Sequence, residues 1–515
     1  MLRALELTLE RDPNIRLAES RIDSARGALL TASSTFDPNL SADLSREDSE
    51  TPTDETTVRD TETLDAGVTW SQRLRSGQTL TPGLDLSRNE LDPASENTAT
   101  VSFALRQPLM RGRDAEAVTA AEVAAERELT ASHLDLAQTL ADRLQAVTIQ
   151  YWAARAAYLD LEILRTTEES SRNLLATTRR LVEADLTPSA ELVQLEADLL
   201  SREVSRLSGE QALYEAMQRL GAAIGLEPDE SSRLPLPAEA FPVVPAPEAA
   251  DPRATGDGAG DDVPPTEAPR ADDPRRSVLL RRALDFRADL RADAERLEAA
   301  RLRLLAADDA LDPQLDLVFT PSYSGFTSGD GFGDYFGPLG DNIPGLSATF
   351  ALAYRFPLGN RAAEGGLLSA EASVRQQTLS LDLARRNVGA EVAVALDSVL
   401  TNARVVAKQE RAVDLFAQAL ENEEKKLRVG SSTLIDVISQ RDRLTSAQQR
   451  LNGARRALAV ALVGLRFETG TLVRFDGQDP LDDPAAAGTP AADPRTATAV
   501  GAGRLRLEDF TTPPF

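Results

Sequence analysis

The segment IRLAESRIDSARGALLTASSTFDPNL, residues 15–40, recurs without gaps as LRADAERLEAARLRLLAADDALDPQL, residues 290–315. Apolar positions coincide in the two segments, and each ends in Asp-Pro, a polar residue and leucine. Similarity of this length within one chain indicates two copies of a single structural unit. The arrangement of this unit therefore decides the fold.

A second ungapped match joins residues 182–225 to residues 427–470. Between the two matching blocks, Gln107-Pro108-Leu109 of the first copy corresponds to Phe356-Pro357-Leu358 of the second. Each copy predicts the same order of elements: a helix, a β segment, a very long helix and a returning helix. We therefore expect two repeats, residues 1–226 and 276–475.

The expected elements can be placed by residue number. The first repeat has a helix over 2–36, a β segment over 38–108, a long helix over 114–183 and a return helix over 189–224. The second repeat begins with a helix at 276 and has a β segment over 313–357, a long helix over 361–429 and a return helix over 433–470. A Pro-rich linker, 227–275, and a tail, 476–515, are expected to be disordered because neither can bury much apolar surface.

Proline spacing and apolar rhythm predict the long helices. No proline lies between Pro108 and Pro188, nor between Pro357 and Pro480. Apolar residues follow a heptad-like rhythm there, which is typical of antiparallel coiled coils. A helix over 114–183 is about 105 Å long, so two shorter helices stacked end to end match one long helix. These helix lengths indicate antiparallel coiled coils about 100 Å long, which could form the wall of a tunnel.

The β segments show the period-two alternation of strands with one apolar face. We expect two membrane strands per repeat, with the extra residues of 38–108 lengthening a hairpin beyond the bilayer. Six strands per chain, and eighteen in a trimer, is the alternative. A soluble sheet packed on the helices is a second alternative. So few strands cannot close a barrel alone, so we expect oligomerisation to pair their edges.

Composition excludes several classes of function. The 515 residues carry a formal net charge of −26, which argues against a nucleic-acid partner. Cysteine is absent and there is a single histidine, so we expect no thiolate metal site, no cofactor and no enzyme. The sequence contains no run of 18 or more apolar residues, so we expect no transmembrane helix. Residues 1–10 are already amphipathic and charged, so either the protein is not exported or its true start lies upstream.

This layout resembles the outer membrane efflux protein (TolC) family over roughly residues 1–475. Phe286-Arg287-Ala288-Asp289-Leu290 resembles the opening motif of the family, with alanine in place of proline. Gln107-Pro108-Leu109-Met110-Arg111-Gly112 resembles the end of its strand segment, and residues 429–437 resemble a helix-hairpin tip. The resemblance implies a mainly α fold with tandem long coiled-coil helices and strands of an inter-subunit β-barrel, twelve-stranded in the family trimer.

The resemblance also implies the sites of contact. Val429, Gly430 and Ser431 match the adaptor-docking tip, and Ala184, Asp185 and Leu186 are their counterparts in the first repeat. Asp436 matches an inward-facing carboxylate of the tunnel constriction, and Glu191 is its repeat partner. A plain helix N-terminal carboxylate is the alternative for Asp436. The family's closing latch would fall on Leu427 and Ser432, which cannot form the same bonds.

We therefore expect a passive, trimeric exit duct of a tripartite efflux or type I secretion system. It would lie in the outer membrane, contact its lipid and extend into the periplasm, where a periplasmic adaptor and an inner-membrane pump would join it. A soluble periplasmic coiled-coil scaffold is the alternative. The sequence does not specify the cargo, the pump class or a lipidated N-terminus.

Overall fold

The computed structural model describes residues 1–52, 58–91, 94–184, 188–244, 274–329, 331–340, 345–429 and 431–472. These residues form two compact units. The helical unit comprises residues 1–20, 133–291 and the chain from Asp382 onward. The sheet unit comprises residues 21–132 and 292–381, and it includes the helix segments that adjoin the strands.

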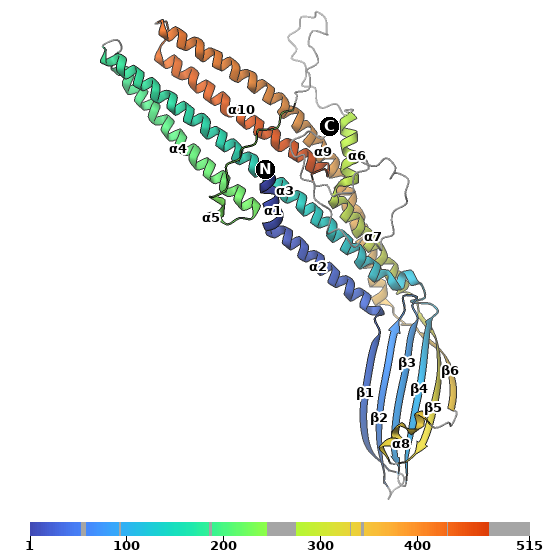
Figure 1. Ribbon diagram of the computed structural model, residues 1–515. Coiled ribbons are helices and arrows are strands. Elements are labelled where there is room, and N and C mark those ends of the chain that lie inside the picture. The colour runs from blue at the N-terminus through green and yellow to red at the C-terminus, as the bar shows by residue number, and fades with distance from the viewer. Residues whose placement is uncertain are drawn as a thin grey trace, which may run out of the picture. The chain divides into compact units, whose positions relative to one another are not determined.

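Helices make up most of the described chain (Figure 1). The longest, α3 and α9, have 69 and 68 residues, so each is about 100 Å long. Among the described residues, no helix is both long enough and apolar enough to cross a membrane. The helices are α1 (Leu2–Arg11), α2 (Pro13–Ser33), α3 (Ala115–Glu183), α4 (Ala190–Ile224), α5 (Pro228–Ser231), α6 (Pro274–Phe286), α7 (Ala288–Asp309), α8 (Phe332–Phe336), α9 (Arg361–Arg428) and α10 (Leu434–Glu468), with short 3-10 turns η1 (Ser34–Phe36) and η3 (Gly337–Leu339).

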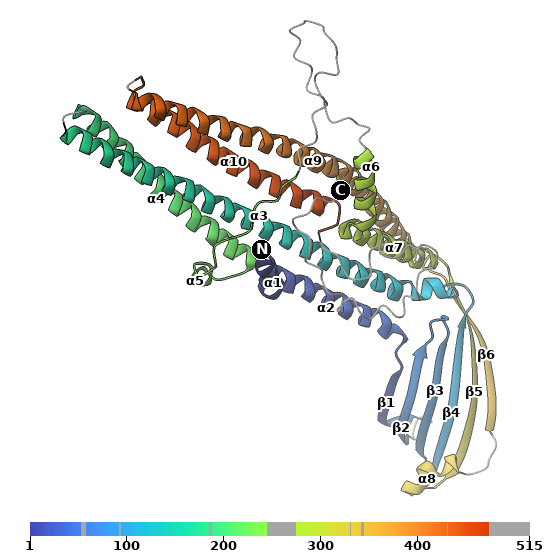
Figure 2. The same ribbon diagram turned by 45° about the horizontal axis from the view of Figure 1, so that its top comes forward.

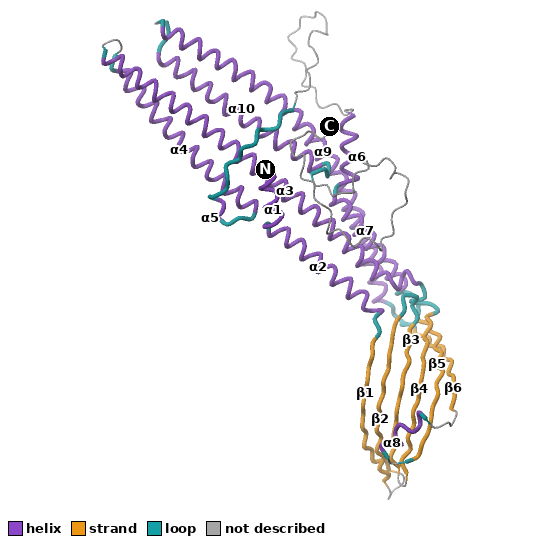
Figure 3. The backbone as a smooth tube through the Cα atoms, viewed as in Figure 1, coloured by secondary structure: helices purple, strands orange, loops and turns teal. Residues whose placement is uncertain are grey.

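The strands form one antiparallel sheet in the order β1-β2-β3-β4-β5-β6 (Figure 3). Each strand therefore pairs with its neighbours in the chain, and β4 pairs with β5 across the two repeats. The strands are β1 (Asn39–Pro52), β2 (Val58–Arg73), β3 (Thr79–Leu91), β4 (Ala94–Pro108), β5 (Gln314–Ser328) and β6 (Gly345–Arg355).

The first repeat contributes four strands, two more than the membrane strands expected there, and the number that cross the membrane stays a prediction. Its extra residues do not extend a loop, because β2 turns tightly into β3. The Leu74 amide donates to the carbonyl oxygen of Gln78 at 2.8 Å, and Gly77 takes a positive φ of 87°. The turn joins β2 to β3, and β3 pairs with β2 on one side and with β4 on the other.

The expectation of a disordered linker is wrong for residues 227–244. Helix α5 covers part of this stretch, and Ser231 is buried against Gly221. Further along, the Phe241 ring stacks on Trp152 with 5.3 Å between ring centroids. Apolar side chains among the prolines therefore bury enough surface to order this part. The rest of the linker, 245–273, and the tail beyond 472 lie outside the described residues.

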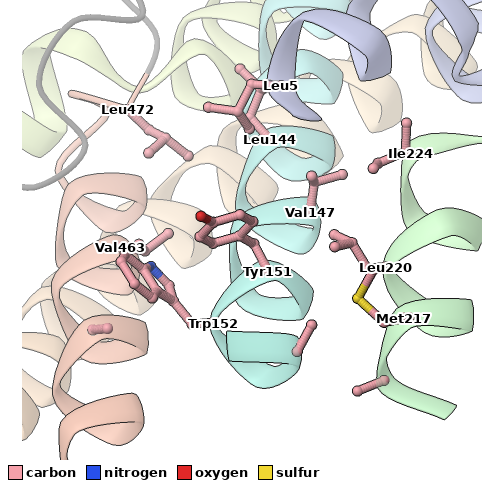
Figure 4. Close-up of a cluster of buried hydrophobic side chains, with 13 residues drawn as sticks. Leu5, Leu144, Val147, Tyr151, Trp152, Met217, Leu220, Ile224, Val463 and Leu472 are labelled. Atoms are coloured by element: carbon pink, nitrogen blue, oxygen red, sulfur yellow. The ribbon is translucent and has the colours of Figure 1, made fainter. Parts of the chain in front are cut away.

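The core of the helical unit joins both repeats around α3 (Figure 4). Trp152 of α3 is 1 % exposed and lies beside Val463 of α10, while Leu220 of α4 packs nearby. Polar contacts add to this packing. The Asn452 side chain of α10 donates to the carbonyl oxygen of Ala156 at 2.8 Å and to the Asp160 carboxylate at 2.7 Å. The two return helices are thus held to a common central helix.

Candidate functional site at the helix-hairpin tips

The tips of the two helix hairpins pack against each other in the helical unit. Leu175 of α3, Leu195 of α4 and Leu434 of α10 form a small buried cluster there. Leu427 and Ile438 pack against the same cluster. Figure 2 shows the α3–α4 and α9–α10 hairpins extending side by side to these tips. The two hairpins therefore contact each other near their ends within one chain.

An ionic contact ties the two return helices below the tips. Arg202 of α4 bonds the Asp198 carboxylate at 2.8 Å on its own helix and also Asp442 of α10. The Arg202 side chain is largely shielded from water. Sequence reasoning did not find this contact, because only the in-helix spacing of Asp198 and Arg202 is visible in the sequence. The arrangement fixes α4 and α10 side by side.

Asp436 sits in a capping box at the start of α10. The Thr433 amide and hydroxyl donate to the Asp436 carboxylate at 3.2 and 2.6 Å, and the Asp436 amide donates to the Thr433 hydroxyl at 3.3 Å. The Thr433 hydroxyl bond is the main reason that the pKa of Asp436 is lowered. The carboxylate therefore stays ionised at neutral pH. This geometry is that of the helix-terminal alternative.

Glu191, the repeat partner of Asp436, has different surroundings. It lies in the first turn of α4, where the N-cap residue, Ser189, makes no side-chain capping bond. Glu191 is partly exposed. The two expected constriction residues are thus both in the first turns of neighbouring return helices, but only Asp436 is engaged in capping. Their role in a tunnel constriction remains a prediction.

The expected docking residues are partly described. Val429 is 77 % exposed just beyond the end of α9, and Ser431 is exposed, with its amide bonded to the carbonyl oxygen of Lys426 at 3.0 Å. Ala184 is exposed at the end of α3. Gly430, Asp185 and Leu186 lie outside the described residues. An apolar Val429 exposed at a tip is available to a partner.

Ser432, at the family's latch position, makes a contact that sequence reasoning missed. Its hydroxyl donates to the Glu423 carboxylate of α9 at 2.5 Å, within the same hairpin. Hydrogen bonds from Ser432 and Lys426 are the main causes that lower the pKa of Glu423. The latch position is therefore used to stiffen its own tip.

A second charged cluster surrounds Arg287, the arginine of the Phe286–Leu290 motif. This arginine lies at the break between α6 and α7, and its side chain is 10 % exposed. It bonds the carboxylates of Asp289, Glu391 and Glu468 at 2.8, 2.9 and 2.6 Å. One cation thus faces three carboxylates. Burial, opposed by Arg287 and reinforced by Glu391, raises the pKa of Glu468 to about 6.

The first repeat has a related contact with the charges exchanged. Asp12 is the counterpart of Arg287 when the alignment of residues 15–40 with 290–315 is extended by three positions. It lies at the break between α1 and α2, is almost fully buried and accepts from Arg143 of α3 at 2.7 Å. In each repeat, therefore, the residue at the helix break bonds the long helix. The first repeat places the acid at the break, and the second places the base there.

The raised pKa of Glu468 predicts a pH-dependent stability. Because the folded pKa of about 6 exceeds the ordinary value of 4.5, folding takes up a proton between these pH values, and stability falls as pH rises through 6. Above that pH, the ionised group costs about 1–2 kcal/mol after allowing for solvent screening. The free energy of unfolding of Glu468→Gln relative to wild type should therefore rise by this amount when the pH is raised from 4.5 to 7.5. Denaturant unfolding at the two pH values measures it. Glu410→Gln, which removes a surface partner of Arg455, is the control. Parallel pH profiles for Glu468→Gln and wild type would contradict the assignment.

Comparisons with known proteins give a family match in the second repeat and a shared fold over most of the chain. The family model described as outer membrane efflux protein matches residues 279–471. A search of curated protein sequences gave no match.

Solved structures with the same fold cover nearly the whole chain. The outer membrane protein VceC from Vibrio cholerae has a TM-score of 0.62 and 18% identity, and the match covers 91% of this chain and 95% of that one. The Campylobacter jejuni CmeC outer membrane channel has a TM-score of 0.61 and 13% identity, with coverage of 91% and 85%. The Neisseria gonorrhoeae MtrE outer membrane channel has a TM-score of 0.58 and 16% identity, with coverage of 91% and 88%. The expected fold class is confirmed.

Proposed function

From the match of residues 279–471 to the outer membrane efflux protein family, together with the shared fold, we propose that three copies of this chain form a passive exit duct. Members of the family are channels rather than enzymes. The duct would cross the outer membrane through the strands and extend into the periplasm through the helices. A single observation supports this assignment most directly: the fold is shared with outer-membrane channels over 91% of the chain.

The edges of the sheet support assembly from several copies. Within the described residues, β1 is hydrogen-bonded in the sheet to β2, and β6 to β5, so each edge strand presents backbone groups to a further strand. Unpaired edges of this kind cannot remain in hydrocarbon, where backbone groups have no water to bond. Pairing with further copies satisfies them, and a trimer is the assembly that we propose.

The exposed tips support a tripartite arrangement. Val429 and Ser431 at one tip and Ala184 at the other are accessible, and the hairpins are already packed together below them. We assign these tips to a periplasmic adaptor, which would connect the duct to an inner-membrane pump. The same arrangement would serve an efflux pump or a type I secretion system.

The soluble-scaffold alternative conflicts with the exposed apolar side chains of β6. Leu346 is 80 % exposed and Phe350 is 71 % exposed, and they alternate with small residues. A soluble protein rarely leaves such a row of large apolar side chains in water. Lipid contact accounts for them.

The test of the proposal is a mass and conductance measurement. Purified in mild detergent, the protein should have three times the chain mass of 55.4 kDa, and it should open ion-conducting pores in planar bilayers. Both results are expected because closed assembly is needed to pair the sheet edges. A monomer that stays soluble without detergent and forms no pores would overturn the proposal and favour the scaffold.

A separate prediction concerns ions at the tip. In a trimer, Asp436 and Glu191 recur three times around one axis, and acidic rings favour cations. Combining Asp436→Asn with Glu191→Gln should shift reversal potentials, measured in a KCl gradient, towards the value of a non-selective pore. Asp397→Asn, a single change within α9 away from the tip, serves as the control. If the double variant keeps the wild-type reversal potential, neither carboxylate lines a constriction.

A further inference from the structure

All six strands present an apolar face on the same side of the sheet. Residues directly opposite in an antiparallel sheet lie on one face, so the pairing register fixes which side chains are together. Thus Leu40 pairs with Trp70, Leu84 with Val101, and Phe319 with Phe350. The apolar face consists of alternate residues within six stretches: 40–44, 64–70, 80–86, 99–105, 315–323 and 346–354. We call this face the apolar belt.

The opposite face of the same strands is polar. Side chains there bond across neighbouring strands: Thr63 to Asn89 at 2.9 Å, Thr100 to Ser324 at 3.0 Å and Ser322 to Ser347 at 2.7 Å. These residues are opposite each other in the register, so the bonds run straight across the sheet. A sheet that is apolar on one face and polar on the other suits a wall between lipid and water.

Charged pairs mark the outer limit of the apolar belt on the first three strands. On the belt side, Arg46 of β1 bonds Glu62 of β2 at 2.8 Å, and Arg88 of β3 bonds Glu90 at 3.0 Å. Leu64 of β2 is opposite both arginines and ends the continuous apolar run of β2. The belt residues span about 14 Å along β1, about 20 Å along β2, β3 and β4, and about 27 Å along β5 and β6. The longer spans fit the apolar band of a membrane barrel, which is about 25 Å tall, and on β1 the pair between Arg46 and Glu62 ends the apolar run earlier.

We infer that all six strands cross the membrane, and that three copies join into an eighteen-stranded barrel. The inference rests on the proposed function, because it needs an outer-membrane trimer. Its support is the first hairpin, β1–β2, whose apolar side chains lie on the same face of the sheet as those of the other four strands. A hairpin lying outside the bilayer would have no need of Leu44, Val68 and Trp70 on one side.

The partner that each edge takes is a second copy of this chain. An even number of strands means that β1 and β6 run in opposite directions, so β6 of one copy meets β1 of the next in the antiparallel sense of the whole sheet. The apolar belt reaches both edges, through the exposed Leu40 and Leu44 of β1 and the exposed Leu346 and Phe350 of β6. Joining the edges therefore continues the apolar belt from copy to copy, and within each copy Tyr335 of α8 covers Leu86 and Ala99 of the belt.

The strand number sets the width of the pore. Barrel diameter grows roughly linearly with strand number, so eighteen strands give a pore about half as wide again as twelve. Barrels of about 16–18 strands hold an open aqueous channel. The polar face, with its serines, threonines and aspartates, would line this channel. The barrel would then pass bulky, hydrated cargo, and selection would fall to the helical tips.

Trp70 tests whether the first hairpin touches lipid. The chain has two tryptophans, and Trp152 lies in the helical core, so Trp152→Phe leaves Trp70 of β2 as the sole fluorophore. Reconstituted with brominated phosphatidylcholine, this variant should lose most of its fluorescence. The matched control moves the ring by one residue, to the polar face, in the variant Trp152→Phe, Trp70→Phe, Thr69→Trp; iodide should quench it and brominated lipid should not. Quenching of Trp70 by iodide alone would overturn the inference.

Cysteine pairs test the junction between copies in a background that keeps Trp152. The chain has no cysteine of its own. Ala42→Cys of β1 should cross-link on oxidation with at least one cysteine at Ala348, Phe350 or Leu352 of β6, giving dimers and trimers on denaturing gels. Ser41→Cys, on the polar face, is the control and should not cross-link with them. If Leu84→Cys of β3 cross-links with β6 instead, the first hairpin lies outside the barrel. If the protein is a trimer by mass but no β1–β6 cross-link forms, the eighteen-stranded barrel is wrong, while the proposed exit duct is not contradicted.

Discussion

Replacing Arg287 by methionine should lower the free energy of unfolding by about 3–5 kcal/mol at pH 7.5, the usual range when one partner of a buried ion pair is removed. The Arg287 side chain is 10 % exposed, and its guanidinium is the cation shared by Asp289, Glu391 and Glu468. Methionine keeps the apolar stem but leaves three carboxylates facing one another. Guanidinium chloride unfolding, followed by circular dichroism at 222 nm in detergent, measures the loss.

The size of this effect should depend on pH. Lowering the pH below 6 protonates Glu468 and so removes part of the repulsion that Arg287→Met exposes. The loss should therefore be smaller at pH 5 than at pH 7.5. Arg455→Met is the control, because its pair with Glu410 is half exposed and a surface pair contributes less than about 1 kcal/mol. Equal losses for the two variants would show that the Arg287 cluster does not stabilise the helix break.

Replacing Trp152 by alanine should cost about 3–5 kcal/mol, as for other large aromatic side chains in a core. Trp152 is edge-on to Tyr151, with 5.4 Å between ring centroids, and stacks on Phe241 at 5.3 Å. Its loss should leave a cavity between α3, α10 and the Leu234 and Phe241 side chains. The same unfolding experiment measures the change.

Two further observations can contradict the role given to Trp152. Tyr214→Ala removes an aromatic ring from an exposed position on α4, and its effect should stay within about 0.5 kcal/mol. Trp152→Ala should also make residues 232–244 more sensitive to protease, because Phe241 loses its stacking partner. Unchanged stability and cleavage would mean that the core forms without the ring.

The long and return helices could be predicted closely because their signals are local, whereas the single helix expected over 2–36 is broken at Asp12 into α1 and α2. Each long helix begins shortly after Pro108 or Pro357, and the apolar rhythm through Leu144 and Val147 places the buried side correctly. The structure has α3 at Ala115–Glu183 and α9 at Arg361–Arg428. Sequence spacing suffices here because one face of a helix is defined by neighbours three and four residues away.

The strand count could not be predicted as reliably. Strand alternation is a weak signal over about ten residues, and charges near Arg46 and Glu62 interrupt it. Read alone, these charges indicate a loop in water. In the structure they pair across β1 and β2, so the strands continue past the apolar belt. The short turn at Leu74–Gln78 returns the chain to the sheet. Composition alone does not distinguish such a hairpin from a loop in water.

The tip residues show the limit of predicting a site from one sequence. Thr433 and Asp436 have the spacing of a capping box, which the structure forms, while a constriction would also need the surroundings of a closed assembly. The Arg202–Asp442 contact joins residues far apart in the chain, and no local pattern predicts it. Contacts within a turn are thus readable from sequence, whereas those between hairpins require the fold.

The exchanged charges at the two helix breaks have a consequence for how the chain folds. Two similar repeats in one polypeptide risk swapping helices, because each break could dock on the wrong long helix. Such a swap would bring Asp12 against Glu391 and Arg287 against Arg143, burying like charges together. Correct docking pairs Asp12 with Arg143 and Arg287 with Glu391. Repulsion in the two like-charged pairings would disfavour the swapped arrangement during folding.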